Sequence, residues 1–153
     1  MSQENVELVR GLQPSPETDL VPLFRNDAAA AALMEAVSPF FHEDVELVAP
    51  TFVTGEGVRF VGLEGFRAGW LDWLEPWESY RVEVEDVVDM GDDALVLVRD
   101  YGRRAEATGE VSVVGAAVWT VREGKVARVA FYLDRSEALK AVGLSEQDVR
   151  ADS

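Results

Sequence analysis

The feature that most constrains the fold is a run of four alternating segments in the second half of the chain, with no helical segment between them. Apolar and polar side chains alternate over residues 80–90, 94–104, 110–121 and 125–134. This is the period of a half-buried β-strand. Residues of turn-forming type separate the first two segments (GDD at 91–93) and the last two (EG at 123–124). Because a parallel pair needs a long crossover connection, such short turns predict an antiparallel meander.

The first half of the chain is predicted to be mostly helical. Apolar spacing indicates helices over 6–12, 26–37 and 62–75, with a further turn over 20–24. We expect one short strand at 44–48, and a short closing helix at 136–144. Helices followed by long strands indicate an α+β fold, with the helices on one face of an antiparallel sheet.

The composition limits the partners of the chain. Its 153 residues include 29 acidic and 14 basic side chains, for a formal net charge of −15. Because such a surface repels phosphate backbones and anionic lipid, we expect no nucleic acid and no membrane among its partners. No apolar stretch approaches the roughly 20 residues that cross a bilayer, and the start of the chain does not read as a secretion signal. We therefore expect a cytoplasmic protein with one domain over residues 1–153 and frayed ends at about 1–3 and 146–153.

Three segments carry a family resemblance: SQENVELVR at the start of the chain, GLEGFRAGWLDWLEPWESYRVEVEDVVDMGDDALVLVR (62–99) and VWTVREGKVARVAFYLDRSEALKAVGL (118–144). In this order, they resemble the first helix, the pocket helix with the strands after it, and the closing hairpin with the terminal helix of the SnoaL-like proteins of the nuclear transport factor 2-like superfamily. The resemblance implies a cone-shaped α+β fold, in which a curved antiparallel sheet wraps around N-terminal helices. It also implies a homodimer that packs through the outer face of the sheet.

Two segments depart from the pattern of these relatives. Residues 11–41 hold a proline-broken, alanine-rich insert where relatives have one long helix and a loop, and residues 51–60 are expected to form an unusually long loop. Both border the pocket mouth in relatives, so the resemblance does not predict the shape of the pocket. The superfamily includes polyketide cyclases, ketosteroid isomerases, limonene epoxide hydrolases, dehydratases and members that only bind or scaffold. Its fold alone therefore assigns no function.

Asp100 is the candidate catalytic residue. The preceding residues on the same face of its predicted strand are Ala94, Val96 and Val98. If this face lines the cone, Asp100 is a carboxyl group in an apolar pocket, where desolvation raises its pKa toward the range of acid–base catalysis. The alternative is that Asp100 faces solvent or pairs with one of the arginines at 99, 103 and 104.

The resemblance to limonene epoxide hydrolases is incomplete at this site. Counted from Gly91, Asp100 has the offset of a catalytic aspartate in those enzymes. However, Val98 stands where they have an arginine, and Phe131 stands where they have a second aspartate. The epoxide hydrolase mechanism is therefore not predicted for this chain.

Aromatic and small apolar side chains are the predicted ligand-binding residues. They are Phe66, Trp70, Trp73, Val98, Ala117, Trp119 and Phe131. The aromatic stripe on 62–75 is typical of ordinary core packing as well as of a ligand site, since the core and the pocket lining of a cone are one surface. The small residues at 115–117 leave space for a ligand, for a close-packed helix or for a dimer partner.

Other polar residues are given structural interpretations. Asp134 precedes a predicted helix and is expected to cap its N-terminus. His42 is the only histidine, and it either reaches the pocket as a base or caps the preceding helix. One histidine, no cysteine and scattered carboxylates offer no ligand spacing, so we expect no metal and no cofactor.

Three functions fit these observations. The first is a cofactor-independent isomerase, cyclase or dehydratase that acts on a small apolar carbonyl compound, with Asp100 moving the proton. The second is a non-catalytic module that binds a small apolar molecule. The third is a dimeric scaffold whose own side chains fill the cone, leaving no cavity above roughly 300 Å³. The sequence does not decide between the first two.

Overall fold

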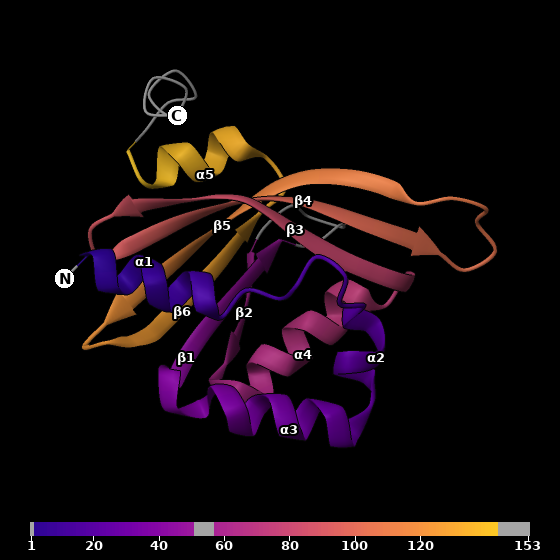
Figure 1. Cartoon of the computed structure of the whole chain (residues 1–153), viewed down its shortest axis with the longest axis horizontal. Helices are drawn as coiled ribbons and strands as arrows, with labels where there is room; N and C mark the ends of the chain where they lie inside the picture. Colours follow the sequence, from indigo (N-terminus) through magenta and orange to yellow (C-terminus); the bar gives the residue numbers. More distant parts are fainter. Residues whose placement is uncertain (1, 51–56, 144–153) are drawn as a thin grey trace.

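The computed structural model describes residues 2–50 and 57–143, which form a curved six-stranded sheet with helices on both faces. The helices are α1 (Ser2–Gly11), α2 (Leu20–Arg25), α3 (Asp27–Val37), the single 3₁₀ turn η1 (Ser38–Phe40), α4 (Gly62–Leu74) and α5 (Arg135–Ala141). The strands are β1 (Phe41–Pro50), β2 (Gly57–Val61), β3 (Trp77–Met90), β4 (Asp93–Arg104), β5 (Val111–Arg122) and β6 (Lys125–Tyr132). The predicted α+β class is confirmed (Figure 1).

The strand order is β2-β1-β6-β5-β4-β3. The predicted meander is present, because β3, β4, β5 and β6 pair antiparallel with their sequence neighbours. One pairing differs from the expected antiparallel arrangement, since β1 pairs with β6 in parallel. The physical reason is that β1 enters from the helical half of the chain and fills the free edge of β6, so no turn dictates its direction.

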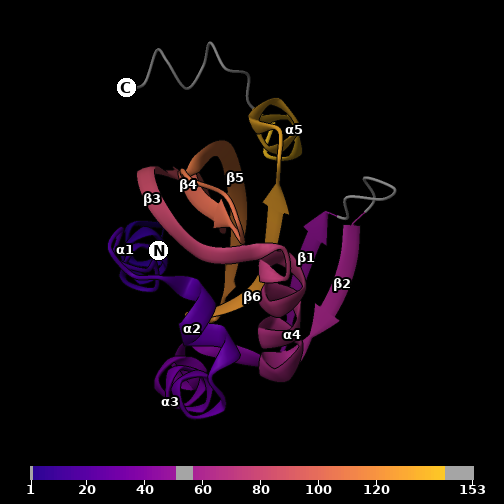
Figure 2. The ribbon, with the colours of Figure 1, turned by 90° about the vertical axis from the view of Figure 1, so that its right-hand side faces the viewer.

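Irregular pairing bends the sheet. The register of β3 against β4 shifts between Trp77 and Ser79 and again between Val84 and Asp86, and that of β5 against β6 shifts between Thr120 and Val121. Such bulges increase the local twist and bend the strand. Figure 2 shows the result, with β3 arching over toward α1 and α2.

The helices divide between the two faces. Helix α4 packs on β1 and β2, α2 packs on α4 and β3, and α1 packs on β3 and β4 (Figures 1 and 2). Together they cover the concave face over the larger hydrophobic core. Helix α5 covers part of the outer face, where Ala138 and Leu139 pack against Leu95 and Val118. The site described below lies on the concave side.

Local differences from the sequence prediction concern the first half of the chain. Strand β1 spans ten residues rather than the five expected at 44–48, and the apolar turn at 20–24 is part of a helix, α2. Part of the loop expected over 51–60 is strand β2, which pairs antiparallel with β1; residues 51–56 lie outside the described residues. Residues 57–61 are too few to show a clear alternation of apolar and polar side chains. They form a strand because β1 offers an open edge.

The ends of the chain fall partly outside the description. Helix α1 already includes Ser2 and Gln3, expected in a frayed end, whereas Met1 and 144–153 lie outside the described residues. Over residues 2–50 and 57–143, the helices are all too short or too polar to cross a membrane.

Gly102→Ala is expected to lower the free energy of unfolding by about 1–3 kcal/mol, because it overpacks a rigid contact. A Cβ atom at Gly102 would lie 2.5 Å from ring atoms of Trp77, whereas one at Gly109 would meet no atom within 4 Å. Gly109→Ala is therefore the control, with an expected change within about 0.5 kcal/mol. Urea denaturation followed by tryptophan fluorescence measures both, and equal values for the two variants would contradict the packing argument.

Candidate functional site

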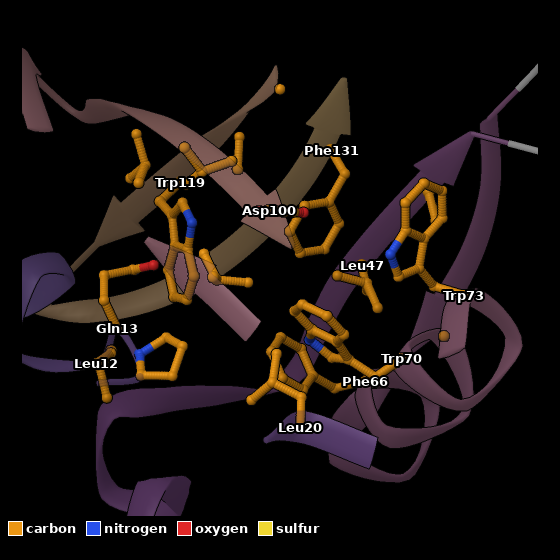
Figure 3. Close-up of a pocket in the computed structure, with 18 of the residues that line it drawn as sticks. Leu12, Gln13, Leu20, Leu47, Phe66, Trp70, Trp73, Asp100, Trp119 and Phe131 are labelled. Atoms are coloured by element: carbon orange, nitrogen blue, oxygen red, sulfur yellow. The ribbon is translucent and has the colours of Figure 1, made fainter. Parts of the chain in front are cut away.

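The concave face of the sheet and the helices around it surround a cavity of about 360 Å³. Its size lies within the range of small-molecule sites. It also exceeds the limit of roughly 300 Å³ that the scaffold hypothesis sets for a cone filled by its own side chains. The scaffold hypothesis required an interior filled by the chain's own side chains, so this cavity counts against it. Figure 3 shows the cavity from close by.

All the predicted site residues lie at this one cavity. The residues concerned are Phe66, Trp70, Trp73, Val98, Asp100, Ala117, Trp119 and Phe131. The sheet positions share the concave face because they alternate along β4, β5 and β6, while helix α4 presents Phe66, Trp70 and Trp73 from the opposite side of the cavity (Figure 3).

The aromatic rings form a connected lining. Trp70 stacks on Phe24 with ring centroids 5.3 Å apart and meets the edge of Phe131, also at 5.3 Å. Phe41 makes edge contacts with Phe66 at 5.3 Å and with Trp119 at 6.3 Å. These are favourable aromatic geometries, and they fix the rings as flat, rigid walls.

The resemblance placed the insert at the pocket mouth, but sequence reasoning named none of its residues as cavity lining. The cavity is also lined from this segment by Leu12, Gln13, Pro14, Leu20, Leu23, Phe24, Leu33, Met34 and Val37. The signal was the apolar spacing of 20–24 and 33–37, which predicts helices but not the direction in which their apolar faces point.

Side chains with several hydrogen-bond partners fix the insert to the rest of the domain. Oδ1 of Asp19 caps α2 by accepting from the backbone N–H of Val21 at 3.0 Å, and it also accepts from the N–H of Tyr80 at 3.1 Å. The guanidinium of Arg25 donates to the carbonyls of Leu74 and Trp77 at 2.9 and 3.1 Å. These bonds join α2 to the end of α4 and the start of β3, so the insert is part of the cavity wall.

Asp100 lies on the concave face of β4 and is partly buried. The arginines considered as its partners bind elsewhere: Arg99 pairs with Glu85 at 3.6 Å, and Arg103 pairs with Glu78 at 3.1 Å. The guanidinium of Arg104 lies 5.2 Å from the ring centroid of Trp77. Among the described residues that line the cavity, Asp100 is the one acidic side chain.

The hydroxyl of Tyr80 donates a hydrogen bond to Oδ2 of Asp100. Oδ1 of Asp100 is buried and has no hydrogen-bond partner among the described residues. Burial raises the pKa of Asp100 from 3.8 to about 6, and the hydrogen bond from Tyr80 opposes this rise. Burial and the adjacent carboxylate raise the pKa of Tyr80 as well, so its hydroxyl stays protonated. The arrangement supplies a carboxyl group that can accept or release a proton near neutral pH.

The remaining polar candidates have structural surroundings. Asp134 caps α5 by accepting from the backbone N–H of Ser136 at 2.9 Å, as predicted. Nε2 of His42 lies 2.8 Å from the carbonyl oxygen of Arg122, and His42 does not line the cavity. In the part of the chain that the structure describes, no three His, Asp or Glu side chains gather as metal ligands would.

Several solved structures share the fold of this chain. TerC, co-crystallised with polyporic acid, is 17% identical with a TM-score of 0.61, over 91% of this chain and 98% of that one. A protein from Jannaschia sp. CCS1, provisionally named a SnoaL-like polyketide cyclase, is 18% identical with a TM-score of 0.58, over 92% of each chain. A protein with a ketosteroid isomerase-like fold from Catenulispora acidiphila DSM 44928, in complex with trimethylamine, is 18% identical with a TM-score of 0.56, over 86% of this chain and 95% of that one.

The sequence profile of the SnoaL-like domain matches residues 24–129. The chain therefore belongs to the SnoaL-like domain family, as its sequence predicted. No curated protein sequence matches it. At such low identities the solved structures establish the fold alone, so the role of the cavity must be argued from its residues.

Asp100→Asn is expected to stabilise the protein increasingly as the pH rises from about 4 to 7. The folded protein holds the Asp100 proton more tightly than the unfolded chain does, since the pKa is raised from 3.8 to about 6. The stability that Asp100 contributes is therefore complete below the lower value and is lost as the pH rises through the higher one.

At about 1.4 kcal/mol for each pH unit, the advantage of the variant should grow by up to about 3 kcal/mol between pH 4 and 7. Urea denaturation at several pH values measures it. Asp72→Asn, on the exposed side of α4, is the control and should track the wild type. Parallel pH profiles for Asp100→Asn and the wild type would show that Asp100 is not held as described.

Proposed function

We propose that this protein is a cofactor-independent acid–base enzyme, an isomerase, cyclase or dehydratase, acting on a small apolar carbonyl compound. The observation that carries the proposal is the position of Asp100. It is a partly buried carboxyl group at an apolar cavity, with one hydrogen bond to Tyr80 and a pKa of about 6. A group with this pKa is present in both protonation states near neutral pH, as a catalyst that takes and returns a proton must be.

The reaction begins when the Asp100 carboxylate removes a proton from a carbon next to the substrate carbonyl. The C–H bond breaks, its electron pair passes into the carbonyl to form an enolate, and the proton binds to the carboxylate oxygen. Return of the proton to another position completes an isomerisation. In a cyclisation, the enolate carbon attacks a second carbonyl, the π electron pair of that carbonyl passes to its oxygen, and the alkoxide takes the proton back from Asp100. In a dehydration, the enolate expels a β-hydroxyl group, which leaves as water with the proton from Asp100. Trp70, Trp119 and Phe131 provide flat apolar walls that hold the substrate against Asp100.

The names and the bound compound of the related structures are compatible with this proposal. One carries the name of a SnoaL-like polyketide cyclase, one has a ketosteroid isomerase-like fold, and one was crystallised with polyporic acid. The names establish no activity for this chain, and the proposal rests on Asp100 and its surroundings.

The proposal predicts that the protein accelerates exchange of the α-hydrogens of 2-tetralone, an apolar bicyclic ketone, with deuterium from D₂O. Proton NMR follows the loss of the α-hydrogen signals with and without protein. Asp100→Asn should lose the acceleration by about 100-fold or more, because it removes the base. Binding of 2-tetralone, measured by quenching of tryptophan fluorescence, should change little, since three tryptophans line the cavity and none is altered.

Asp72→Asn makes the same chemical change on the exposed side of α4 and should exchange 2-tetralone like the wild type. Saturable binding with no acceleration by the wild type would reject the enzymatic proposal. Equal exchange rates for Asp100→Asn and the wild type would reject the assignment of Asp100.

The second candidate is a module that binds an apolar molecule without converting it. It is favoured by Val98 and Phe131, which stand where limonene epoxide hydrolases have further catalytic groups and which line the cavity as apolar side chains. The experiment above separates the two candidates, because this one requires saturable quenching by 2-tetralone with no exchange.

The homodimer implied by the family also remains a proposal. Val114 lies on the outer face of β5 and is 36% exposed. It stands opposite Arg99 of β4, which forms an ion pair with Glu85 of β3. If the outer face is the interface, Val114→Glu should move the protein from dimer to monomer in sedimentation equilibrium, because it places a charge in a desolvated contact. Val58→Glu, on edge strand β2, is the matched control and should leave the mass unchanged.

A further inference from the structure

Tyr80 connects the cavity carboxyl group to helix α4 through one hydrogen bond and one ring contact. Its hydroxyl donates to Oδ2 of Asp100, and its ring makes an edge contact with Trp73, with ring centroids 6.3 Å apart. The three side chains come from three elements, β3, β4 and α4. Figure 3 shows the indole nitrogen of Trp73 turned toward the interior of the cavity, on the side where Asp100 lies.

The Tyr80 ring is immobilised by its surroundings. Its side chain is 1% exposed, and it packs against Trp73 and Trp77 with ring centroids 6.3 and 5.4 Å away. The backbone N–H of Tyr80 donates to Asp19 in the insert. The hydroxyl is therefore fixed in direction before a ligand enters, and it can hold the Asp100 side chain in one rotamer.

We propose that Tyr80 is a positioning residue for the reaction proposed above: its hydroxyl, oriented by Trp73, holds the Asp100 carboxylate in place and keeps it available as a base near neutral pH. The role of Tyr80 in the reaction rests on the proposed function. The hydrogen bond from Tyr80 to Asp100 itself rests on the geometry. Sequence reasoning placed Tyr80 only at the start of a strand and treated Trp73 only as part of an aromatic wall.

The elements around Asp100 offer it no other charged partner within the described residues. On its own strand, Arg99 and Arg103 pair with glutamates, as described above. Across the sheet, Val82 of β3 and Val113 of β5 stand opposite it. Asp19 is exposed and is bonded to backbone N–H groups. Tyr80 is therefore the titratable group whose contact sets the behaviour of Asp100.

Two opposing effects act on the carboxyl group. Burial favours its neutral form, whereas the Tyr80 hydroxyl favours the ionised form by donating to it. Burial and the Asp100 carboxylate raise the pKa of Tyr80, whereas the adjacent Trp73 side chain lowers it and so makes the hydroxyl a better donor. Without the hydroxyl, burial acts alone and a larger fraction of Asp100 is protonated at neutral pH.

The experiment is a pH titration of ligand-free protein labelled with ¹³C at the aspartate carboxyl carbons. Comparison with the Asp100→Asn spectrum assigns the Asp100 signal, and the wild-type midpoint is expected near 6. Tyr80→Phe should move that midpoint upward by about one pH unit, the size of a charge-assisted hydrogen bond. Trp73→Phe should move it in the same direction by less. Tyr101→Phe is the control on the opposite face of β4 and should leave it unchanged.

The pH dependence of 2-tetralone exchange tests the catalytic meaning. For Tyr80→Phe the acid limb of the profile should shift upward with the carboxyl midpoint. Exchange at pH 7 should fall about twofold, the loss of ionised carboxylate expected when the midpoint moves from about 6 to about 7, and most of the rate should return above pH 8. A variant that had only lost structure would be slow at every pH, so a uniform loss would overturn the positioning role.

Unchanged midpoints in both Tyr80→Phe and Trp73→Phe would also overturn the inference. If Tyr80→Phe does not fold, the Trp73→Phe titration decides, because it leaves the Tyr80 hydroxyl in place. An upward shift of the carboxyl midpoint combined with no exchange by the wild type would support the hydrogen bond from Tyr80 to Asp100 and reject the enzymatic proposal, so the two failures are distinguishable.

Discussion

Register shifts bend β3 so that it arches over the N-terminal helices, and the cavity depends on this curvature. A flat sheet would pack against α4 at contact distance and leave no interior space. In the curved sheet, α4 makes such contact at one side, where a Cβ atom at Gly69 would lie 2.2 Å from Leu47. Farther along the same concave face, the space between α4, the insert and strands β4 and β5 is the cavity.

The apolar lining gives Asp100 its chemical character. A carboxyl group that loses water without gaining a cation holds its proton more tightly, and here the arginines nearest in sequence bind other partners. The Tyr80 hydroxyl supplies a limited compensation. Burial raises the pKa of Asp100 to about 6 against the opposing effect of one hydrogen bond. The proposed reaction and the proposed role of Tyr80 both follow from this balance.

Much of the cavity could be predicted from the sequence because strand alternation and helical spacing are local properties. The period of β4 placed Val98 and Asp100 on one face, and the apolar stripe of α4 placed Trp70 and Trp73 on another, and the structure brings these faces together. The insert could not be assigned in the same way. Its short helices have apolar residues, but hydrogen bonds from Asp19 and Arg25 to distant backbone groups determine where those residues point.

The sequence by itself determined the α+β class, the antiparallel meander, the Asp134 cap and which residues of β4, β5 and α4 line the cavity. These depend on periodicity and on residue preferences within a few positions of one another. The tertiary structure decided the parallel pairing of β1 with β6, the strand at 57–61, the packing of the insert and the contact of Tyr80 with Asp100. Those features join residues far apart in the chain, and their geometry follows from how the sheet bends and closes, which no local pattern encodes.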